Sequence, residues 1–153
     1  MASPESFVTG SEQDTVTLGA TLARTLPRGT FVLLHGDLGA GKTAFVRGLA
    51  SGLGADPGEV SSPTFVLIQH YRGRVPLTHV DLYRLDSAAA VDDLGLEELA
   101  IEGVVAVEWA DRLPRPIDGS MTVKIEDLGG DARRITIEPG TWNPERGTWN
   151  LEP

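Results

Sequence analysis

The chain of 153 residues contains no cysteine, which excludes disulfides, thiolate catalysis and cysteine-based zinc sites. No apolar run approaches the roughly 20 residues that cross a bilayer. The first residues show neither the basic stretch nor the apolar stretch of a secretory signal. We therefore expect a soluble, cytoplasmic protein without membrane contact. Hydrophobic residues still make up 41% of the chain, which is enough for the core of one domain.

Basic residues are scarce, because 13 Lys and Arg stand against 22 Asp and Glu and give a formal net charge of −9. A protein that grips nucleic acid alone needs clustered Lys and Arg for phosphate contacts. The charge argues against such a role. If the chain works on RNA, we expect a partner to hold it.

Apolar runs over residues 30–35 and 103–109 are typical of strands buried on both faces of a sheet. Helical and extended patterns alternate along the chain, which predicts a three-layer α/β fold with a mixed, mostly parallel central sheet. We expect one domain over residues 1–139 and a tail over 140–153. The expected elements are strands 7–9, 30–35, 65–71, 75–82 and 103–109, helices 11–26, 42–53 and 87–99 with a break near Gly95, and an edge hairpin of 121–125 with 133–137.

The tail contains a short near-duplication, because residues 140–145 recur in similar form as residues 147–152. Two copies are too few for a repeat fold. The two tryptophans of the tail either cover apolar patches of the surface or dock a partner, and the first interpretation is favoured.

Residues 36–43 match the pattern G-x-x-x-x-G-K-[ST] in full. Glycines allow successive backbone N–H groups to surround a phosphate, and the following helix adds the partial charge of its N-terminus. Lys42 is expected to reach the β- and γ-phosphates, and Thr43 to offer its hydroxyl to Mg²⁺. The motif predicts a P-loop NTPase-like protein that holds ATP with magnesium. The expected nucleotide-binding residues here are Gly36, Asp37, Leu38, Gly39, Ala40, Gly41, Lys42, Thr43 and Ala44.

Two acids stand where a magnesium site needs them, at the ends of predicted strands. Glu108 follows four apolar residues, as in a Walker B strand, and Asp81 closes the strand that contains His79. Either acid can hold the metal through water or orient the attacking water, and the sequence leaves this choice open. His79 shares a strand face with Asp81. It either steadies that acid or is an ordinary strand histidine.

Thr64 lies in a Ser-Pro-Thr loop after the P-loop helix, where GTPase-like proteins place a switch threonine that senses the γ-phosphate. We expect that role for Thr64. Arg84 forms either a surface ion pair, which is slightly favoured, or a phosphate contact.

Four blocks together, in this order and spacing, resemble the TsaE (YjeE) family over roughly residues 7–137. The blocks are the P-loop, Ser62-Pro63-Thr64-Phe65, His79-Val80-Asp81-Leu82-Tyr83-Arg84 and Val107-Glu108-Trp109.

The resemblance implies a Mg²⁺-dependent ATPase that acts with the TsaB–TsaD pair in N6-threonylcarbamoylation of adenosine 37, in tRNAs that read ANN codons. Transfer RNA would be met only through that complex. The family's catalytic and metal roles map onto the matching residues Lys42, Thr43, Thr64, Asp81 and Glu108. The resemblance also implies an N-terminal threonine near the base and an arginine on a late strand, for which Thr9 and Arg133 are the equivalents.

Three other classes of protein remain as alternatives. A small-molecule kinase normally carries a lid with paired arginines, and the arginines after Glu108 form no helical lid pattern. A GTP-binding switch would read guanine with Asn-Lys-x-Asp, whereas Asn143 and Asn150 are the only asparagines and stand outside such a motif. A scaffold with a degenerate site is disfavoured because Lys42, Thr43 and both acids are present.

Overall fold

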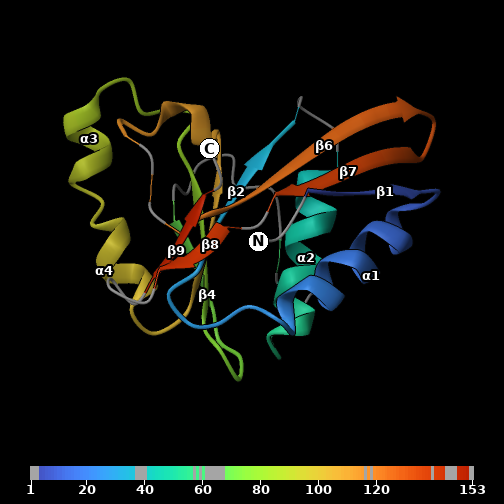
Figure 1. The fold of residues 1–153 in the computed structure, drawn as a ribbon, viewed down its shortest axis with the longest axis horizontal. Coiled ribbons are helices and arrows are strands. Elements are labelled where there is room, and N and C mark those ends of the chain that lie inside the picture. The colour runs from blue at the N-terminus through green and yellow to red at the C-terminus, as the bar shows by residue number, and fades with distance from the viewer. Residues whose placement is uncertain are drawn as a thin grey trace.

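The computed structural model describes residues 4–36, 41–56, 58, 60, 68–115, 117, 119–138, 140–143 and 148–151. Within this part, a central sheet of seven strands runs in the order β1-β7-β6-β2-β5-β4-β3 (Figure 1). The strands are β1 (Glu5–Thr9), β2 (Phe31–His35), β3 (Ile68–Tyr71), β4 (Leu77–Asp81), β5 (Val104–Glu108), β6 (Met121–Gly129) and β7 (Ala132–Glu138).

The four central strands, β6, β2, β5 and β4, pair in parallel, while β7, β1 and β3 add antiparallel neighbours. The predicted mixed sheet with a mostly parallel centre is therefore confirmed. β2 and β5 lie in the middle of this sheet, and this agrees with their apolar sequences, since both of their faces are covered by helices.

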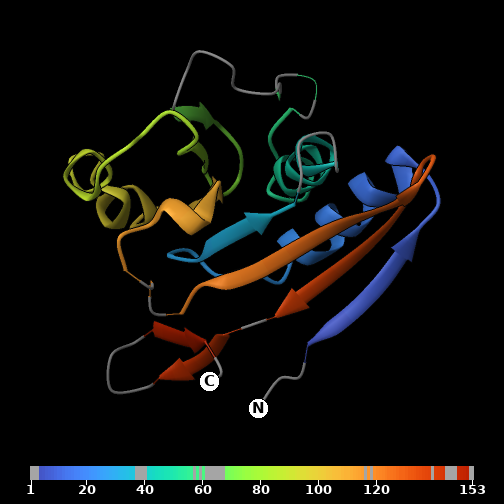
Figure 2. The ribbon, with the colours of Figure 1, turned by 90° about the horizontal axis from the view of Figure 1, so that it is seen from above.

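Helices cover both faces of the sheet, which gives the predicted three layers (Figure 2). Alternate residues of β2 face opposite cores, because successive side chains of a strand point to opposite sides. Val32 and Leu34 belong to the core under α1 (Glu12–Ala23) and α2 (Lys42–Gly52). Phe31 and Leu33 belong to the core shared with α3 (Ala88–Asp92) and α4 (Leu96–Ala100).

α1 packs on α2 mainly through glycines, and not through the leucine face that the sequence predicts. A Cβ atom on Gly48 would lie 2.1 Å from the carbonyl oxygen of Val16, so the two backbones touch at this point. The predicted leucine face of α1 is only partly buried at Leu18 and Leu22, whereas Gly19 is fully buried. Small residues therefore set the position of α2, whose first turn carries the P-loop lysine.

Local turn chemistry sets two of the predicted helix boundaries. Ser11 caps α1 as predicted, since its hydroxyl accepts the backbone N–H of Asp14 at 3.1 Å. The predicted break near Gly95 is also present, because Gly95 has a φ of 67° and separates α3 from α4. α1 ends at Ala23, three residues before the predicted end, because the chain turns there toward β2.

The predicted edge position of the hairpin over β6 and β7 is wrong. β6 pairs with β2, and β7 pairs with β1 along the register from Glu5 opposite Ile137 to Thr9 opposite Arg133. The N-terminal strand satisfies the open hydrogen-bonding groups of β7, so that β1 and β3 form the edges instead. The hairpin is thus fixed on both sides, and Arg133 at the start of β7 lies beside Gly41 of the P-loop.

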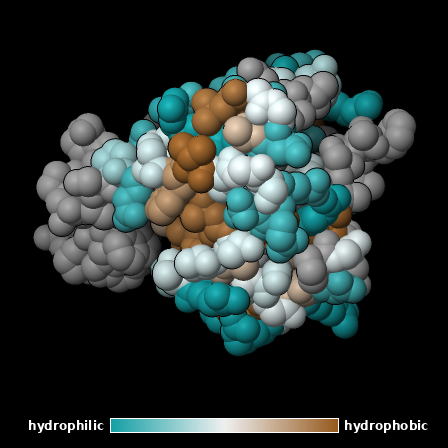
Figure 3. Space-filling view, turned by 90° about the vertical axis from the view of Figure 1, so that its right-hand side faces the viewer, coloured by the Kyte–Doolittle hydropathy of each residue, from teal (hydrophilic) through white to brown (hydrophobic). Residues whose placement is uncertain are grey.

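The face that carries β1, α1 and the β6–β7 hairpin shows a band of hydrophobic side chains among hydrophilic ones (Figure 3). Val8 on β1 is 67% exposed, and Leu128 on β6 is 42% exposed. In the part of the chain that the structure describes, no helix has the length and apolar character needed to span a membrane.

The tail contributes a separate two-stranded sheet of β8 (Gly140–Asn143) and β9 (Thr148–Leu151). The two strands pair antiparallel, and Trp142 lies opposite Trp149 in their register. The near-duplication of the sequence therefore corresponds to the two strands of one hairpin.

Candidate functional site

The P-loop lysine is placed by the start of α2. Gly41 caps the helix with a φ of 104°, a left-handed conformation that glycine adopts without strain. Lys42 follows as the first residue of the helix and is only 6% exposed. Its Nζ donates a hydrogen bond to the carbonyl oxygen of Gly36 at 2.8 Å, which joins the two ends of the loop. Asp37, Leu38, Gly39 and Ala40 lie outside the described residues.

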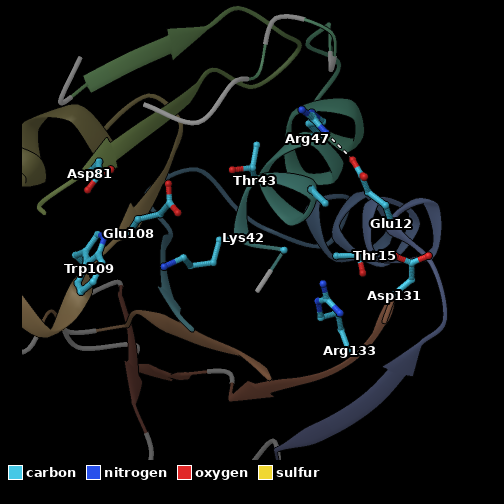
Figure 4. Close-up of a pocket in the computed structure, with 12 residues that line it drawn as sticks. Glu12, Thr15, Lys42, Thr43, Arg47, Asp81, Glu108, Trp109, Asp131 and Arg133 are labelled. Atoms are coloured by element: carbon cyan, nitrogen blue, oxygen red, sulfur yellow. Dashed lines mark hydrogen bonds and ion pairs between the residues drawn. The ribbon is translucent and has the colours of Figure 1, made fainter. Parts of the chain in front are cut away.

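Asp81 and Glu108 end the neighbouring strands β4 and β5, where they are direct partners in the parallel register. The carboxyl ends of parallel strands meet at one edge of a sheet, so the two acids come close to the N-terminus of α2. Both acids, Lys42 and Thr43 face one pocket of about 570 Å³ (Figure 4). The pocket is lined by Glu12, Thr15, Gly41, Lys42, Thr43, Ala44, Arg47, Asp81, Glu108, Trp109, Asp131 and Arg133.

His79 contacts Glu108 and not the acid on its own strand. Its Nε2 lies 2.7 Å from Oε2 of Glu108, and the imidazole is fully buried. Nδ1 of His79 is buried without a partner among the described residues, so the tautomer with the proton on Nε2 leaves no N–H unsatisfied. Of the two interpretations of His79, steadying an acid is the one that the geometry supports, although the acid is Glu108.

Asp81 carries a carboxylate that the surrounding protein destabilises. Burial raises the pKa of Asp81 above its usual value, and the nearby charge of Glu108 raises it further. The backbone N–H of Tyr83, which donates to Oδ1 of Asp81 at 2.8 Å, acts in the opposite direction. His79 and Lys42 also lower the pKa, but burial is the largest effect. A second cation in the pocket would relieve this destabilisation.

The donor set fits a divalent cation that is bound jointly with phosphates. Among the residues that the structure describes, no group of three or more acidic or histidine side chains surrounds a single point. The hydroxyl of Thr43 and the carboxylates of Asp81 and Glu108 instead line the same pocket. Hard oxygen donors of this kind suit Mg²⁺, which keeps several waters and takes its remaining ligands from a nucleotide.

Arg133 lies across the pocket from the acids (Figure 4), and Thr9 lies behind the pocket wall. Arg133 lines the pocket and lies close to the P-loop, since its Nε is 3.7 Å from where a Cβ of Gly41 would be. Thr9 is buried and does not line the pocket, but its hydroxyl lies 2.9 Å from that of Thr15, which does. Thr9 therefore supports the pocket wall through Thr15.

Several pocket residues were not predicted from the sequence, namely Glu12, Thr15, Arg47 and Asp131. Arg47 donates to Glu12 at 2.7 Å, an ion pair that joins α2 to α1 at the pocket rim. The partners are far apart in sequence, so only the packing of the two helices brings them together. Thr15 is a polar residue on the inward face of α1, four residues after Ser11, and this position is a weak indication of a role in the site. Thr64 lies outside the described residues.

A buried lysine at the start of a helix, beside two acids at the ends of parallel strands, defines the class of P-loop nucleotide-binding proteins. Comparison with known proteins narrows this class. The model of the TsaE family, described as threonylcarbamoyl adenosine biosynthesis protein TsaE, matches residues 9–135. The chain belongs to the TsaE family.

Individual relatives agree with this assignment. The protein named tRNA threonylcarbamoyladenosine biosynthesis protein TsaE of Treponema pallidum is 41% identical over 132 residues, which cover 85% of this chain and 97% of the relative. The protein of the same name from a Nostoc species is 46% identical over 135 residues, covering 84% of this chain and 82% of the relative. The crystal structure of Bacillus subtilis YdiB superposes with a TM-score of 0.67 at 31% identity, covering 90% of this chain and 86% of YdiB.

Proposed function

We propose that this chain is a Mg²⁺-dependent ATPase required for threonylcarbamoylation of adenosine 37 in tRNAs that read ANN codons. The observation that carries the proposal is one pocket in which Lys42 and Thr43 of the P-loop face Asp81 and Glu108, in a member of the TsaE family. The Treponema pallidum relative, of which the chain covers 97%, is named for tRNA threonylcarbamoyladenosine biosynthesis. A hydrolase needs a cation that binds the phosphates, oxygen ligands for a metal and an acid that acts on water, and the lining of this pocket by Lys42, Thr43, Asp81 and Glu108 supports the proposal.

Each residue has a distinct part in the proposed reaction. The Lys42 ammonium would bind the β- and γ-phosphates, and the helix N-terminus behind it adds its partial positive charge. Thr43 and the acids Asp81 and Glu108 would hold Mg²⁺ directly or through water, and the metal would neutralise charge that develops on the phosphates. The hydrogen bond between His79 and Glu108 supports a second role for Glu108, which would orient the attacking water.

Three further residues are proposed to bind the nucleotide, namely Thr9, Ala44 and Arg133. Ala44 and Arg133 line the pocket, and Thr9 supports it through Thr15. Thr64 keeps its proposed role as a switch that senses the γ-phosphate.

The proposed partner is the TsaB–TsaD heterodimer, with tRNA met only through that complex. The net charge of −9 supports this arrangement, because an acidic chain makes a poor clamp for tRNA. A role in tRNA modification also fits the cytoplasm. Residues 1–139 would form the ATPase domain and residues 140–153 a tail.

The experiment that tests the proposal is phosphate release from ATP, measured with the purified chain alone and with added TsaB–TsaD. We expect Mg²⁺-dependent hydrolysis that the heterodimer stimulates strongly, and that EDTA abolishes. Glu108→Ala and Asp81→Ala should reduce turnover more than they reduce ATP binding. No hydrolysis in the presence of the heterodimer would contradict the proposal.

An acceptor screen with ATP and a binding measurement with GTP and ATP separate the alternative functions. Transfer of the γ-phosphate to a sugar, a shikimate-like acid or a nucleoside would identify a small-molecule kinase. Equal or tighter binding of GTP than of ATP would identify a guanine-nucleotide switch.

A further inference from the structure

Trp109, the residue after the strand-end acid Glu108, has an unusual backbone conformation. Its φ is 58°, the only positive value at a non-glycine residue in the described part of the chain. An L side chain in the left-handed region is strained, and such residues cluster at functional sites where surrounding contacts hold them. The turn leads from β5 into the short helix η2 (Ala110–Arg112) and leaves the Trp109 side chain on the pocket wall.

The ring of Trp109 contacts the phosphate-binding lysine. Nζ of Lys42 lies 5.1 Å from the ring centroid, within the range of a cation–π interaction. Figure 4 shows the Lys42 side chain extending toward Trp109. Among the described residues, this ammonium also donates a hydrogen bond to the Gly36 carbonyl oxygen. Both partners are neutral, so the positive charge of Lys42 remains uncompensated by either of them.

The two acids of the pocket are also bound to groups other than Lys42. Glu108 is held by the His79 imidazole, and Asp81 accepts the backbone N–H of Tyr83. Among the described residues, no ion pair joins Lys42 to a carboxylate, although both acids line the same pocket. A lysine paired with Glu108 or Asp81 would have to break that pair before it could bind phosphate.

The Trp109 ring is itself held from the surface side. The ring of Tyr83 packs against it with a centroid separation of 4.8 Å and an interplanar angle of 47°. The Arg112 guanidinium lies 5.8 Å from the Trp109 centroid and 5.7 Å from that of Tyr83. Arg112 is in turn anchored by a hydrogen bond to the Leu85 carbonyl oxygen at 3.0 Å. These contacts fix the ring in the position that the strained backbone provides.

We propose that Trp109 is a positioning residue for Lys42: its ring holds the ammonium beside Gly36 and away from Glu108 and Asp81, which keeps the lysine available for phosphate. The inference deepens the proposed function, since it rests on Lys42 binding phosphate. The contact between Lys42 and Trp109, however, can be tested without adding nucleotide.

The first test measures the contact directly by fluorescence. The chain has three tryptophans, so Trp142→Phe with Trp149→Phe leaves Trp109 as the single emitter. In this background we expect Lys42→Met to shift or intensify the Trp109 emission, because a nearby ammonium perturbs the indole. Lys124→Met is the matched control, since Lys124 is the only other lysine and is exposed on β6. Emission that is unchanged by Lys42→Met would overturn the proposal.

The second test measures nucleotide affinity by calorimetry with Trp109→Leu, Trp109→Phe and the tail variant Trp142→Leu as control. We expect Trp109→Leu to weaken ATP binding about 3- to 30-fold, the range of a partly desolvated cation–π contact. Trp109→Phe should restore part of that loss because it keeps an aromatic face. The effect should appear in the Kd and KM for ATP more than in kcat.

The outcomes distinguish this inference from the proposed function. If the wild-type chain binds no ATP, the proposed function fails, while the emission test still decides the Lys42–Trp109 contact. If the wild type binds ATP and Trp109→Leu binds it equally well, the positioning role is wrong. Affinities that follow the melting temperatures of the variants, and not the presence of an aromatic ring, would also overturn it.

Discussion

At the residue scale, the site keeps its charged groups apart and ready for a ligand. Lys42 is held by a carbonyl oxygen and an aromatic ring, and Glu108 by an imidazole. Groups arranged in this way need little reorganisation when a phosphate and a metal arrive, which is the condition for strong electrostatic stabilisation in an enzyme site. The cost is a less stable protein in the absence of ligand, since buried charge is left uncompensated.

Replacing Lys42 tests how much its ammonium group contributes to ATP binding and turnover. We expect Lys42→Ala to reduce ATP affinity or turnover by at least about 10-fold, because a charge-assisted contact to phosphate is lost. Lys124→Ala is the control, since it removes the same charge from an exposed site beside Glu138. Isothermal titration with ATP and a phosphate-release assay measure the two effects. Equal loss in both variants would indicate a general charge effect and contradict the assignment of Lys42.

Asp81 gives a prediction about stability and pH in the ligand-free chain. Its pKa is raised in the folded state, so the ionised form is disfavoured by folding and costs stability at neutral pH. Asp81→Asn removes that charge and keeps an oxygen for the Tyr83 N–H, and we expect a higher melting temperature at pH 7. The gain should shrink as the pH falls through the folded-state pKa toward the ordinary value of 3.8, because the wild-type group then becomes neutral as well.

Thermal denaturation by circular dichroism from pH 7 to pH 4 measures this difference. With Mg²⁺ and ATP present the order should reverse, since the carboxylate is then a ligand. A melting temperature of Asp81→Asn below that of the wild type at pH 7 without ligand would contradict the prediction.

At the element scale, the position of the P-loop helix depends on close backbone contact between α1 and α2. We expect Gly48→Ala to destabilise the fold by about 3 kcal/mol, since the added methyl group meets backbone atoms that cannot move aside. Gly10→Ala is the control, because its new methyl group would find only the Asp14 carboxylate, at 3.8 Å. Urea denaturation of both variants measures the effect. A Gly48→Ala variant as stable as the wild type would show that the helices can separate without cost.

Contacts between elements are also where prediction from the sequence fails, whereas features within one element can be predicted. The positions of the strand-end acids and of the P-loop lysine can be predicted, because they depend on local patterns, an apolar run and a glycine-rich turn. The contact of His79 with Glu108 was not, since it depends on the register between β4 and β5. Arg47 with Glu12 likewise requires the packing of α1 on α2. The edge position assigned to the β6–β7 hairpin was wrong because alternation of polar and apolar residues does not identify the neighbouring strand.

At the scale of the whole molecule, the net charge of −9 opposes direct binding of the tRNA that the proposed pathway modifies. Phosphate contacts require clustered basic residues, and several basic side chains of the described residues are paired with carboxylates. Arg47, Arg115 and Arg134 each face a carboxylate, and so does Lys124. An acidic surface repels tRNA over about a Debye length, so affinity for tRNA has to come from a partner.

This charge distribution predicts that the chain alone does not bind tRNA. With fluorescently labelled tRNA at physiological salt, we expect no change in anisotropy up to about 10 µM protein, a concentration in the middle of the range of ordinary non-specific dissociation constants. Addition of TsaB–TsaD should produce binding, and the chain should then join the complex without adding to the salt dependence, since it contributes no phosphate contacts. Submicromolar binding by the chain alone, weakened steeply by salt, would contradict the prediction and require a basic surface that forms only on tRNA. ATP binding measured in the same sample confirms that the protein is folded, so that absence of tRNA binding can be assigned to charge.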